Sequence, residues 1–456
     1  MPIHIIFLAA AIITLAPPPT LSLSTSPPPS PPPSSPLLAP IQKDHTTLRY
    51  TLSVYLKTPP QRLDLLLHLG GRFSWVDCYS GNYSFATYRH IPCNFSVCVP
   101  LDSLACSYCY DRPPGPTCSN DTCEYFPENP LTRKVGLEDA LLDALGLPST
   151  DGSSAGRVDV VPDFLFSCAK PDLLAEFPKG TSGLAALGFS NVSLPVQVAE
   201  ARSLLRCFSL CLSGSWSAAG VTFVGTAGPY NFLPGIDLSK GLTYTPILLN
   251  PQGDTVITYA REPAAEYYVG VTAVRVNGKV VPLNATLLKT RGDADMQIGR
   301  GETLISTVLP YTALQTSIFR AVTQAFAREA SATFNLTTIQ PVKPFSLCYS
   351  ARDVGVTRAG PAVPAIDLVM QSEDVFWRVF GANLMVRIQR KGTDAWCLGL
   401  VDGGAEARAA IVIGGHQVED NLLQFDLGSM RLGFSSSVLV RGTTCADFNF
   451  TTDNHT

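Results

Sequence analysis

The chain repeats one pattern in its two halves, and this repeat constrains the fold more than any other feature. In the first half, the apolar residues 65–67 run into His68-Leu-Gly-Gly, and Gly183-Leu-Ala-Ala-Leu-Gly188 follows later. In the second half, residues 303–305 run into Ser306-Thr-Val-Leu-Pro, and Ile411-Val-Ile-Gly-Gly follows. A strand with a turn, and later an apolar segment ending in glycine, therefore occurs twice. We expect two lobes of similar construction.

Short apolar or alternating segments bounded by Gly, Pro, Asn or Asp dominate the chain, as is typical of β-strands. The clearest are residues 48–56, 63–67, 158–166, 221–224, 267–276 and 410–413. Helical periodicity is scarce, with the best candidate at 311–330 and shorter ones at 194–205 and 374–379. Roughly 400 residues exceed one ordinary core and suit two. The sequence predicts a mostly β, two-lobed protein with a few short helices.

The two halves resemble the duplicated, bilobal fold of pepsin-like aspartic proteases. The tail, with Phe425-Asp and Arg431-Leu-Gly-Phe, strengthens the resemblance. That family places one aspartate in each lobe, and the two carboxylates share a proton to activate water. Here His68 stands at the first aspartate position and Ser306 at the second, and Val308 replaces the glycine of the second turn. The resemblance therefore implies the fold without the catalytic dyad.

Two interpretations of these positions remain open. Histidine can act as a general base near neutral pH, so one hypothesis is a Ser306 nucleophile activated by His68. No orienting carboxylate or oxyanion hole can be identified for it. The other is a buried imidazole, hydrogen-bonded at the base of a relict cleft. Residues 128–136, which correspond to the protease flap, lack the Tyr-Gly pair of its tip.

Other catalytic patterns do not occur in the sequence. It contains no Gly-X-Ser-X-Gly elbow, no His-Glu-X-X-His pair and no phosphate-binding loop. The 6 histidines are too scattered to indicate a metal site. We expect no cofactor, no metal and no enzymatic activity.

The N-terminal region carries sorting and spacer signals. Residues 5–16 form an apolar run that is shorter than the roughly 18–20 residues of a membrane span, which favours a secretory signal peptide over residues 1–22. The Pro/Ser-rich stretch that follows cannot bury enough apolar surface to fold, so we assign residues 23–45 to an extended spacer. Folding is expected to begin near Thr46, with lobes at 46–235 and 236–456 and a cysteine-rich insertion at 78–123.

Thirteen cysteines behind a signal peptide indicate disulfides formed in an oxidising compartment. Seven lie in the insertion: Cys78, Cys93, Cys98, Cys106, Cys109, Cys118 and Cys123. The pair Cys106-Ser-Tyr-Cys109 also has zinc-ligand spacing, which is the alternative interpretation. Eight glycosylation sequons support secretion: Asn82, Asn94, Asn120, Asn191, Asn284, Asn335, Asn449 and Asn454. The net charge of -4, without a basic cluster, argues against nucleic acid as a partner, and no later apolar run is long enough to span a membrane.

Five longer segments resemble one plant family more closely. They are residues 69–78, 157–168, 302–312, 357–369 and 414–427. They are similar to the family of extracellular dermal glycoprotein, the basic globulins of legume seeds and the xylanase inhibitors of cereal grain, a likeness that covers essentially the whole mature chain. The resemblance implies an aspartic-protease scaffold that has lost proteolysis and binds other proteins. Several members inhibit microbial glycoside hydrolases by inserting loop side chains into the sugar cleft.

In that family the inhibitory loops precede a Gly-Pro pair and the last cysteine, and the arginines found there match Arg358 and Arg441. A guanidinium can bind one of the two catalytic carboxylates of a glycosidase through two hydrogen bonds. The alternative is that both are ordinary solvated arginines. Because xylanase inhibitors have a histidine where this chain has Arg441, a xyloglucan-specific endoglucanase is favoured over a xylanase.

The resemblance also implies a disulfide frame. It pairs Cys78 with Cys168, Cys211 with Cys445 and Cys348 with Cys397, and it confines the other bridges to the stretch between Cys93 and Cys123. Cys207 is left as a buried free thiol.

Three functions stay open on the sequence. The favoured one is a secreted inhibitor of a microbial cell-wall-degrading hydrolase, acting in the extracellular space or cell wall. The second is a storage, receptor or peptide-binding protein like the seed globulins. An active hydrolase is the third.

Overall fold

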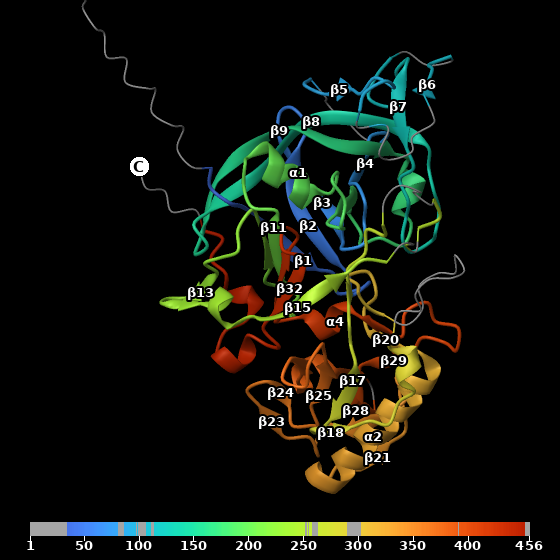
Figure 1. The fold of residues 1–456 in the computed structure, drawn as a ribbon, viewed down its shortest axis with the longest axis vertical. Coiled ribbons are helices and arrows are strands. Elements are labelled where there is room, and N and C mark those ends of the chain that lie inside the picture. The colour runs from blue at the N-terminus through green and yellow to red at the C-terminus, as the bar shows by residue number, and fades with distance from the viewer. Residues whose placement is uncertain are drawn as a thin grey trace, which may run out of the picture. The chain divides into compact units, whose positions relative to one another are not determined.

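A computed structural model describes residues 34–80, 86–96, 98, 106–110, 114–250, 253, 255–257, 263–289, 302–390 and 392–451. Strands dominate these residues, and the prediction of a mostly β protein is confirmed (Figure 1). The α-helices are α1 (Leu194–Ala201), α2 (Thr316–Phe334), α3 (Gly381–Leu384) and α4 (Gly415–Val418). Within the described part, none of the helices has the length and apolar composition needed to cross a membrane.

The first lobe is built from antiparallel hairpins around a core of leucine, valine and phenylalanine side chains. Its strands are β1 (Leu37–Lys43), β2 (Tyr50–Leu56), β3 (Gln61–His68), β4 (Trp75–Asp77), β5 (Arg89–His90), β6 (Cys106–Ser107), β7 (Thr122–Tyr125), β8 (Glu138–Thr150), β9 (Ala155–Ala169) and β10 (Gly183–Ala186). The long β8–β9 hairpin borders this lobe in Figure 1, and β2–β3 lies inside it.

The second lobe contains two small four-stranded sheets, with α2 against its core. One sheet has the order β18 (Lys279–Val280), β17 (Ala273–Val276), β25 (Ile366–Val369) and β26 (Phe376–Val379). The other has the order β21 (Thr338–Ile339), β22 (Cys348–Ser350), β28 (Thr393–Leu398) and β27 (Met385–Arg390). Asn335, in the left-handed conformation (φ 54°), ends α2, as is common for a residue just past a helix.

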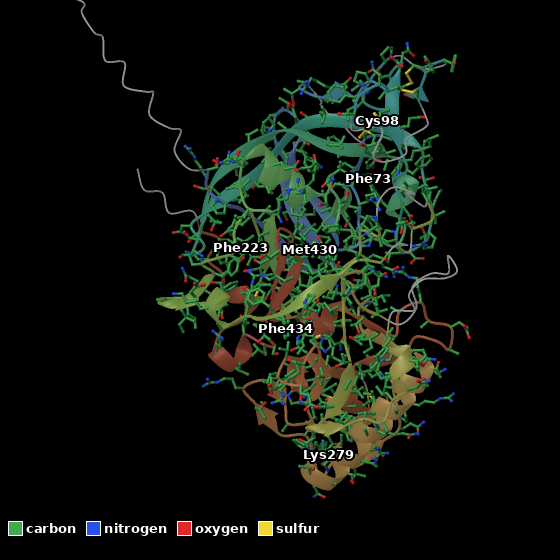
Figure 2. All side chains as sticks on the ribbon, viewed as in Figure 1. Phe73, Cys98, Phe223, Lys279, Met430 and Phe434 are labelled. Atoms are coloured by element: carbon green, nitrogen blue, oxygen red, sulfur yellow. A yellow bond between two sulfur atoms is a disulfide. The ribbon has the colours of Figure 1, made fainter. Side chains whose placement is uncertain are left out.

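Strands from both halves of the chain pair in one sheet that joins the lobes. These are β11 (Cys207–Cys211), β12 (Gly220–Val224), β15 (Thr243–Leu248), β31 (Leu422–Asp426) and β32 (Arg431–Phe434). Phe208 of β11 stacks on Phe425 of β31 with ring centroids 4.7 Å apart. Phe223 and Phe434 lie inside the molecule near this junction (Figure 2). The C-terminal segment 422–434 therefore completes a sheet begun in the first half.

The repeat seen in the sequence corresponds to a repeated strand arrangement. In the first lobe, β3 pairs in parallel with β10, and the Leu187 N–H donates to the His68 carbonyl over 3.0 Å. In the second, β19 (Thr303–Ile305) pairs in parallel with β30 (Ile411–Ile413), and the Ser306 N–H donates to the Ile413 carbonyl over 2.9 Å. Each half thus supports its turn on a neighbouring parallel strand.

The folded region begins at an earlier residue than the sequence predicts. Residues 37–43, assigned to the spacer, form β1, which pairs with β2, β8 and β12. Leu37, Leu38 and Ile41 are fully buried there. The short apolar Leu-Leu-Ala-Pro-Ile sequence therefore belongs to the core, and the boundary at Thr46 was wrong. The predicted signal peptide and the first part of the spacer, residues 1–33, lie outside the described residues.

Three predicted elements also differ from the structure. The helix predicted from Tyr311 begins at Thr316, because residues 312–314 form strand β20 beside β30. Where a helix was predicted at 374–379, the structure has strand β26 (Phe376–Val379), in which Trp377 and Val379 alternate with half-exposed neighbours on a sheet. The strand predicted at 267–276 divides into β16 (Tyr268–Val269) and β17, which residues 270–272 separate.

Candidate functional site

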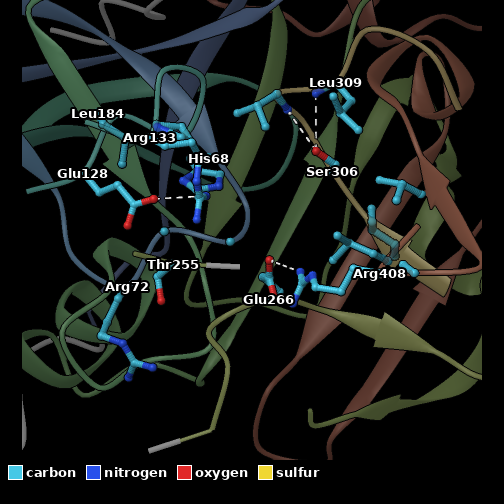
Figure 3. A pocket seen from close by; sticks show the side chains of 18 of the residues that line it. His68, Arg72, Glu128, Arg133, Leu184, Thr255, Glu266, Ser306, Leu309 and Arg408 are labelled. Atoms are coloured by element: carbon cyan, nitrogen blue, oxygen red, sulfur yellow. Dashed lines mark hydrogen bonds and ion pairs between the residues drawn. The ribbon is translucent and has the colours of Figure 1, made fainter. Parts of the chain in front are cut away.

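His68 and Ser306 come from different lobes but line the same pocket. His68 is the last residue of β3, and Ser306 follows β19 directly. The pocket has a volume of about 330 Å3, and Figure 3 shows the two side chains on its opposite sides. The structure thus brings together the two positions that the sequence analysis assigned to the relict cleft.

Thr307, beside Ser306, binds the opposite lobe at the His68 turn. Its hydroxyl donates to the Leu67 carbonyl over 2.8 Å and accepts from the Leu69 N–H over 3.2 Å. The two hydrogen bonds involve the residues on either side of His68, so the turn at Ser306 contacts the turn at His68 across the lobe boundary. The equivalent position in the first lobe is Leu69, which has no hydroxyl to return the interaction. Sequence reasoning overlooked Thr307, although its place next to Ser306 was a usable signal.

The carboxylates that line this pocket are held in separate ion pairs. Glu128 lies 3.0 Å from the Arg133 guanidinium, and Glu266 lies 2.6 Å from that of Arg408 (Figure 3). The Tyr268 hydroxyl also donates to Glu266 over 2.6 Å. A shared-proton dyad requires two carboxylates facing each other, and these two each face an arginine. Among the described residues that line the pocket, Glu128 and Glu266 are the only acids.

The Ser306 hydroxyl is engaged by its own turn. Its oxygen accepts from the N–H groups of Val308 and Leu309, each over 3.3 Å (Figure 3). On the other side, a side chain at Gly71 would meet the His68 ring at 3.2 Å and Ala186 at 2.9 Å. The glycines after His68 therefore leave room for the imidazole against β10.

The segment in the flap position is fixed to the first lobe. Asn129 is fully buried, and its side-chain amide donates to the carbonyls of Leu173 and Ala175, each over 2.8 Å. Its oxygen accepts from the N–H groups of Leu131 and Thr132. Because movement of this segment would break four hydrogen bonds of one buried side chain, opening and closing over the pocket is unfavourable.

Arg358 lies at the tip of a tight hairpin, which we call the Arg358 hairpin: strands β23 (Val356–Thr357) and β24 (Gly360–Pro361). The Thr357 hydroxyl donates to the Gly360 carbonyl over 2.8 Å. Gly360 has φ 94°, and a Cβ there would lie 2.3 Å from the Ala382 backbone nitrogen. Glycine is therefore required where the hairpin lies on α3. The Arg358 side chain itself is exposed.

Arg441 lies in a short 3₁₀ turn, Leu439–Arg441, which ends at Gly442 (φ 80°); we call it the Arg441 turn. Arg441 is exposed, and its guanidinium lies over the backbone of Gly241. Val440 and Arg358 line one hollow of about 480 Å3, so turn and hairpin are neighbours on the same side of the second lobe (Figure 1). Their 83-residue separation in sequence (441 minus 358) concealed this convergence.

Comparison with known proteins agrees with this architecture. Residues 50–226 match the family described as xylanase inhibitor N-terminal, and residues 266–436 match xylanase inhibitor C-terminal. The chain belongs to this xylanase-inhibitor family.

Relatives of the xylanase-inhibitor family match nearly the whole chain. "Probable aspartic proteinase GIP1" of Glycine max is 47% identical over 90% of this chain and 91% of its own length. "Gamma conglutin 1" of Prunus dulcis is 38% identical, over 92% and 90%. The crystal structure of edgp, 46% identical, has a TM-score of 0.86 and covers 92% of this chain and 99% of its own. That of conglutin gamma from lupine seeds, 34% identical, has a TM-score of 0.76 over 92% and 100%. The predicted family and pepsin-like bilobal fold are confirmed.

The disulfides of this xylanase-inhibitor family member form the frame that the resemblance implied. The structure pairs Cys78 with Cys168, Cys211 with Cys445 and Cys348 with Cys397. Within the insertion, the pairs are Cys93–Cys106, Cys98–Cys123 and Cys109–Cys118. Cys106 and Cys109 are thereby both oxidised, which removes the zinc alternative. Burial raises the pKa of the remaining thiol, Cys207, to about 12, and the charge of Asp426 adds to this effect.

A buried ionic cluster that the sequence analysis did not identify supports the Arg441 turn. Glu419 binds Lys43 and the Tyr50 hydroxyl, each over 2.5 Å. Burial alone would raise the Glu419 pKa, but the hydrogen bond from His416 and the charge of Lys43 bring it below its usual value. The adjoining Asp420 accepts from the Cys445 N–H with its side chain and from the Val438 N–H with its carbonyl, each over 2.8 Å.

Asp420 therefore holds both ends of the segment that carries Arg441. Its burial raises its pKa to about 6, and the neighbouring charges of Glu419 and Asp447 act in the same direction. The Cys445 N–H and Lys43 oppose this shift. Asp420 has φ 49°, a left-handed conformation that aspartate and asparagine tolerate better than most residues.

The sequons in the described part have exposed asparagines: Asn94, Asn120, Asn191, Asn284, Asn335 and Asn449. Exposure is what attachment of a bulky glycan requires. Asn82 and Asn454 lie outside the described residues.

Proposed function

We propose that this protein is a secreted, proteolytically inactive member of its family that inhibits a microbial cell-wall-degrading glycoside hydrolase. It acts in the extracellular space or cell wall, on an enzyme of the xyloglucan-specific endoglucanase or xylanase type. Arg358 and Arg441 enter the sugar cleft of that enzyme. The observation that carries this proposal is that the loops of both exposed arginines meet at one hollow, which is lined by Arg358 and by Val440, the residue before Arg441.

The chemistry of the target fits two neighbouring arginines. A glycosidase cuts between two carboxylates, which lie about 5–9.5 Å apart depending on the mechanism. A guanidinium offers a planar set of donors that matches a carboxylate through two parallel hydrogen bonds. Within a cleft closed to water, such a charge-assisted contact is stronger than on an open surface. Two arginines from one side of the inhibitor can therefore occupy the site where the sugar is cleaved.

The rigid frames of both loops favour tight binding. The Ala382 N–H donates to the Ala359 carbonyl over 2.8 Å at the base of the Arg358 hairpin. The Arg441 turn is fixed by Asp420 and by the Cys211–Cys445 disulfide. Loops that are already ordered lose little conformational entropy when they bind.

The same proposal holds that His68 and Ser306 replace both catalytic aspartates. Without a facing carboxylate, His68 cannot supply the shared proton, and the Ser306 oxygen already accepts two backbone N–H groups. Acid proteolysis of casein by the purified protein that disappears in His68→Ala would contradict this part of the proposal.

The inhibition itself is tested with a panel of secreted endoglucanases and xylanases, by measuring sugar release from xyloglucan and arabinoxylan. We expect Arg358→Ala and Arg441→Ala each to raise the inhibition constant by roughly 30- to 4,000-fold, the range for truncating one partner of a buried charge pair. Arg320→Ala is the matched control, an exposed arginine on α2 about 21 Å along the helix axis from Phe334. Absence of inhibition and of a complex in gel filtration across the panel would refute the proposal.

A second candidate function is storage or the binding of a peptide or other ligand, without inhibition. It is favoured by the inter-lobe pocket of about 330 Å3, whose mixed polar and apolar lining is typical of ligand sites. Fragment or peptide binding that His68→Ala weakens, in a protein that inhibits none of the panel, would establish it.

A further inference from the structure

Two neighbouring tyrosines are exposed in the cysteine-rich insertion. Tyr108 is 54% exposed and Tyr110 is 86% exposed, and their ring centroids lie 6.3 Å apart with the ring planes tilted by 42°. They follow β6, which pairs with β7 at the end of the first lobe that is remote from the second lobe (Figure 1). Two exposed rings side by side form an apolar patch of the kind that a ligand or a partner group covers.

The glycosylation sequon at Asn120 lies directly beside these rings. The Asn120 side-chain oxygen accepts a hydrogen bond from the Cys109 N–H over 2.8 Å, and Cys109 is the residue between the two tyrosines. The Cys109–Cys118 disulfide holds the two segments together. The nitrogen to which a glycan is attached belongs to the same amide group, so the first sugar begins next to the backbone that carries both rings.

The sequon at Asn284, in the second lobe, has a different environment. Its side-chain oxygen accepts from the N–H and the hydroxyl of Thr286, within its own turn, over 3.1 and 2.8 Å. The exposed large aromatic side chains of the described residues all belong to the first lobe: Phe95, Tyr108, Tyr110 and Trp216. Asn284 therefore provides a sequon without an aromatic patch of this kind for comparison.

We propose that Asn120 carries an N-linked glycan whose first N-acetylglucosamine packs against Tyr108 and Tyr110. The substituents of this sugar are equatorial, so its axial C–H bonds form an apolar face on each side of the ring. The negative face of an aromatic ring attracts such weakly positive C–H groups. In the attachment step, the amide nitrogen loses one proton and bonds to the anomeric carbon of the sugar, whose bond to a lipid-linked pyrophosphate donor breaks.

The packed sugar protects the insertion from proteases outside the cell. Chymotrypsin-like proteases cleave after tyrosine and must bind its side chain first. A sugar that covers both rings therefore slows cleavage at this exposed segment. This inference rests on the secretion that the proposed function includes, but it does not depend on inhibition of a hydrolase.

Thr122 allows a test that leaves Asn120 itself unchanged. It is the third residue of the sequon and is 1% exposed on β7. Thr122→Val removes the hydroxyl that glycosylation requires and keeps a β-branched side chain on the strand. Thr122→Ser retains the sequon and is the matched control. Mass spectrometry of protein secreted from eukaryotic cells should find a glycan on Asn120 in the wild type and in Thr122→Ser, but not in Thr122→Val.

Nitration with tetranitromethane then measures whether the rings are covered, with the half-buried Tyr55 as the internal reference. Tyr108 and Tyr110 should react about two- to tenfold faster in Thr122→Val than in Thr122→Ser, the factor that one aromatic contact contributes to an equilibrium. Wild-type protein trimmed with an endoglycosidase that leaves the first sugar should stay as protected as the untrimmed protein. Chymotrypsin cleavage after Tyr110 should follow the same order.

Thermal unfolding identifies variants that keep the fold. If Thr122→Val does not fold, wild-type protein treated with a glycoamidase, which leaves a carboxylate at position 120, takes its place in the comparison. Thr286→Val removes the sequon at Asn284 and should leave the nitration of both tyrosines unchanged.

Three results would overturn the inference. The first is an unoccupied Asn120 in the secreted wild type, and the second is equal nitration of the protein with and without the glycan. The third is loss of protection on trimming to one sugar, which would show that the outer sugars shield the rings without contact from the first. The proposed inhibition of a hydrolase would stand in each case.

Discussion

The hydroxyl of Thr307 provides the sharpest test of how the two lobes are joined. Thr307 is 1% exposed, and the Leu67 carbonyl and Leu69 N–H that it binds belong to fully buried residues. Thr307→Val keeps the shape of the side chain but leaves both backbone groups without this partner. A buried polar group without its hydrogen bond costs about 1–3 kcal/mol, so the free energy of unfolding should fall by about 2–5 kcal/mol.

Thr307→Ser is the control, because it retains the hydroxyl and loses one methyl group, at a cost of about 0.8 kcal/mol. The stability of each variant is measured by urea unfolding. Hydrogen exchange at the Leu69 amide provides a local measurement and should accelerate in Thr307→Val but not in Thr307→Ser. If the two variants differ by less than about 0.5 kcal/mol and exchange alike, the crossing hydrogen bonds do not stabilise the junction.

The remaining predictions concern the C-terminal segment and the free thiol. The pKa of Asp420 is raised from 3.8 to about 6 in the folded protein. The contribution of its protonated carboxyl to the free energy of unfolding is therefore fully present below pH 4 and is lost as the pH rises through 6. Relative to the wild type, the free energy of unfolding of Asp420→Asn in urea should therefore rise between pH 4 and 7, by up to about 3 kcal/mol. If the difference between the two proteins is the same at both pH values, the pKa of Asp420 is not raised. Replacing Cys211 and Cys445 together by alanine removes a disulfide that links residues 234 positions apart, so the free energy of unfolding should fall by about 5 kcal/mol. Trypsin should then cleave faster after Arg441, and equal cleavage rates in variant and wild type would contradict this prediction. Cys207 should not react with a thiol reagent at pH 8 until the protein is denatured, and rapid reaction of the native protein would show that the thiol is accessible.

The parts of the fold that were predictable from the sequence depend on neighbouring residues. The turns at His68 and Ser306, and the strands that lead into them, carry strong local patterns of apolar residues followed by glycine or proline. The strand pairs β3–β10 and β19–β30 repeat this pattern in both halves. The disulfide pairing was predicted from the family resemblance, because no local sequence pattern determines it.

What the sequence concealed depends on contacts between distant residues. Residues 37–43 contain Pro40 and follow a proline-rich stretch, and only their pairing with β2, β8 and β12 makes them a strand. Residues 374–379 read as a short helix because the local spacing of apolar residues is ambiguous over so few positions. Arg358 and Arg441 were identified through the resemblance, but the hollow that Arg358 and Val440 line, where the two loops meet, required the folded chain.

The spacing of these two arginines depends on how the second lobe meets the sheet that joins the lobes. The Arg358 hairpin rests on α3 of the second lobe, whereas the Arg441 turn follows β32 of the joining sheet. Trp377 connects the two: it stacks on Phe434 with ring centroids 5.3 Å apart, and its indole N–H donates to Asn421 over 3.2 Å.

Trp377 lies on β26, so the strand that was mistaken for a helix is also the contact that sets this spacing. The Arg378 N–H adds a hydrogen bond to the Ser436 hydroxyl over 3.0 Å, close to the start of the Arg441 turn. None of these residues lines the pocket that contains His68 and Ser306. The frame of the two arginines is therefore separate from the pocket that contains His68 and Ser306, so substitutions in that pocket need not disturb the surface that we propose binds the hydrolase.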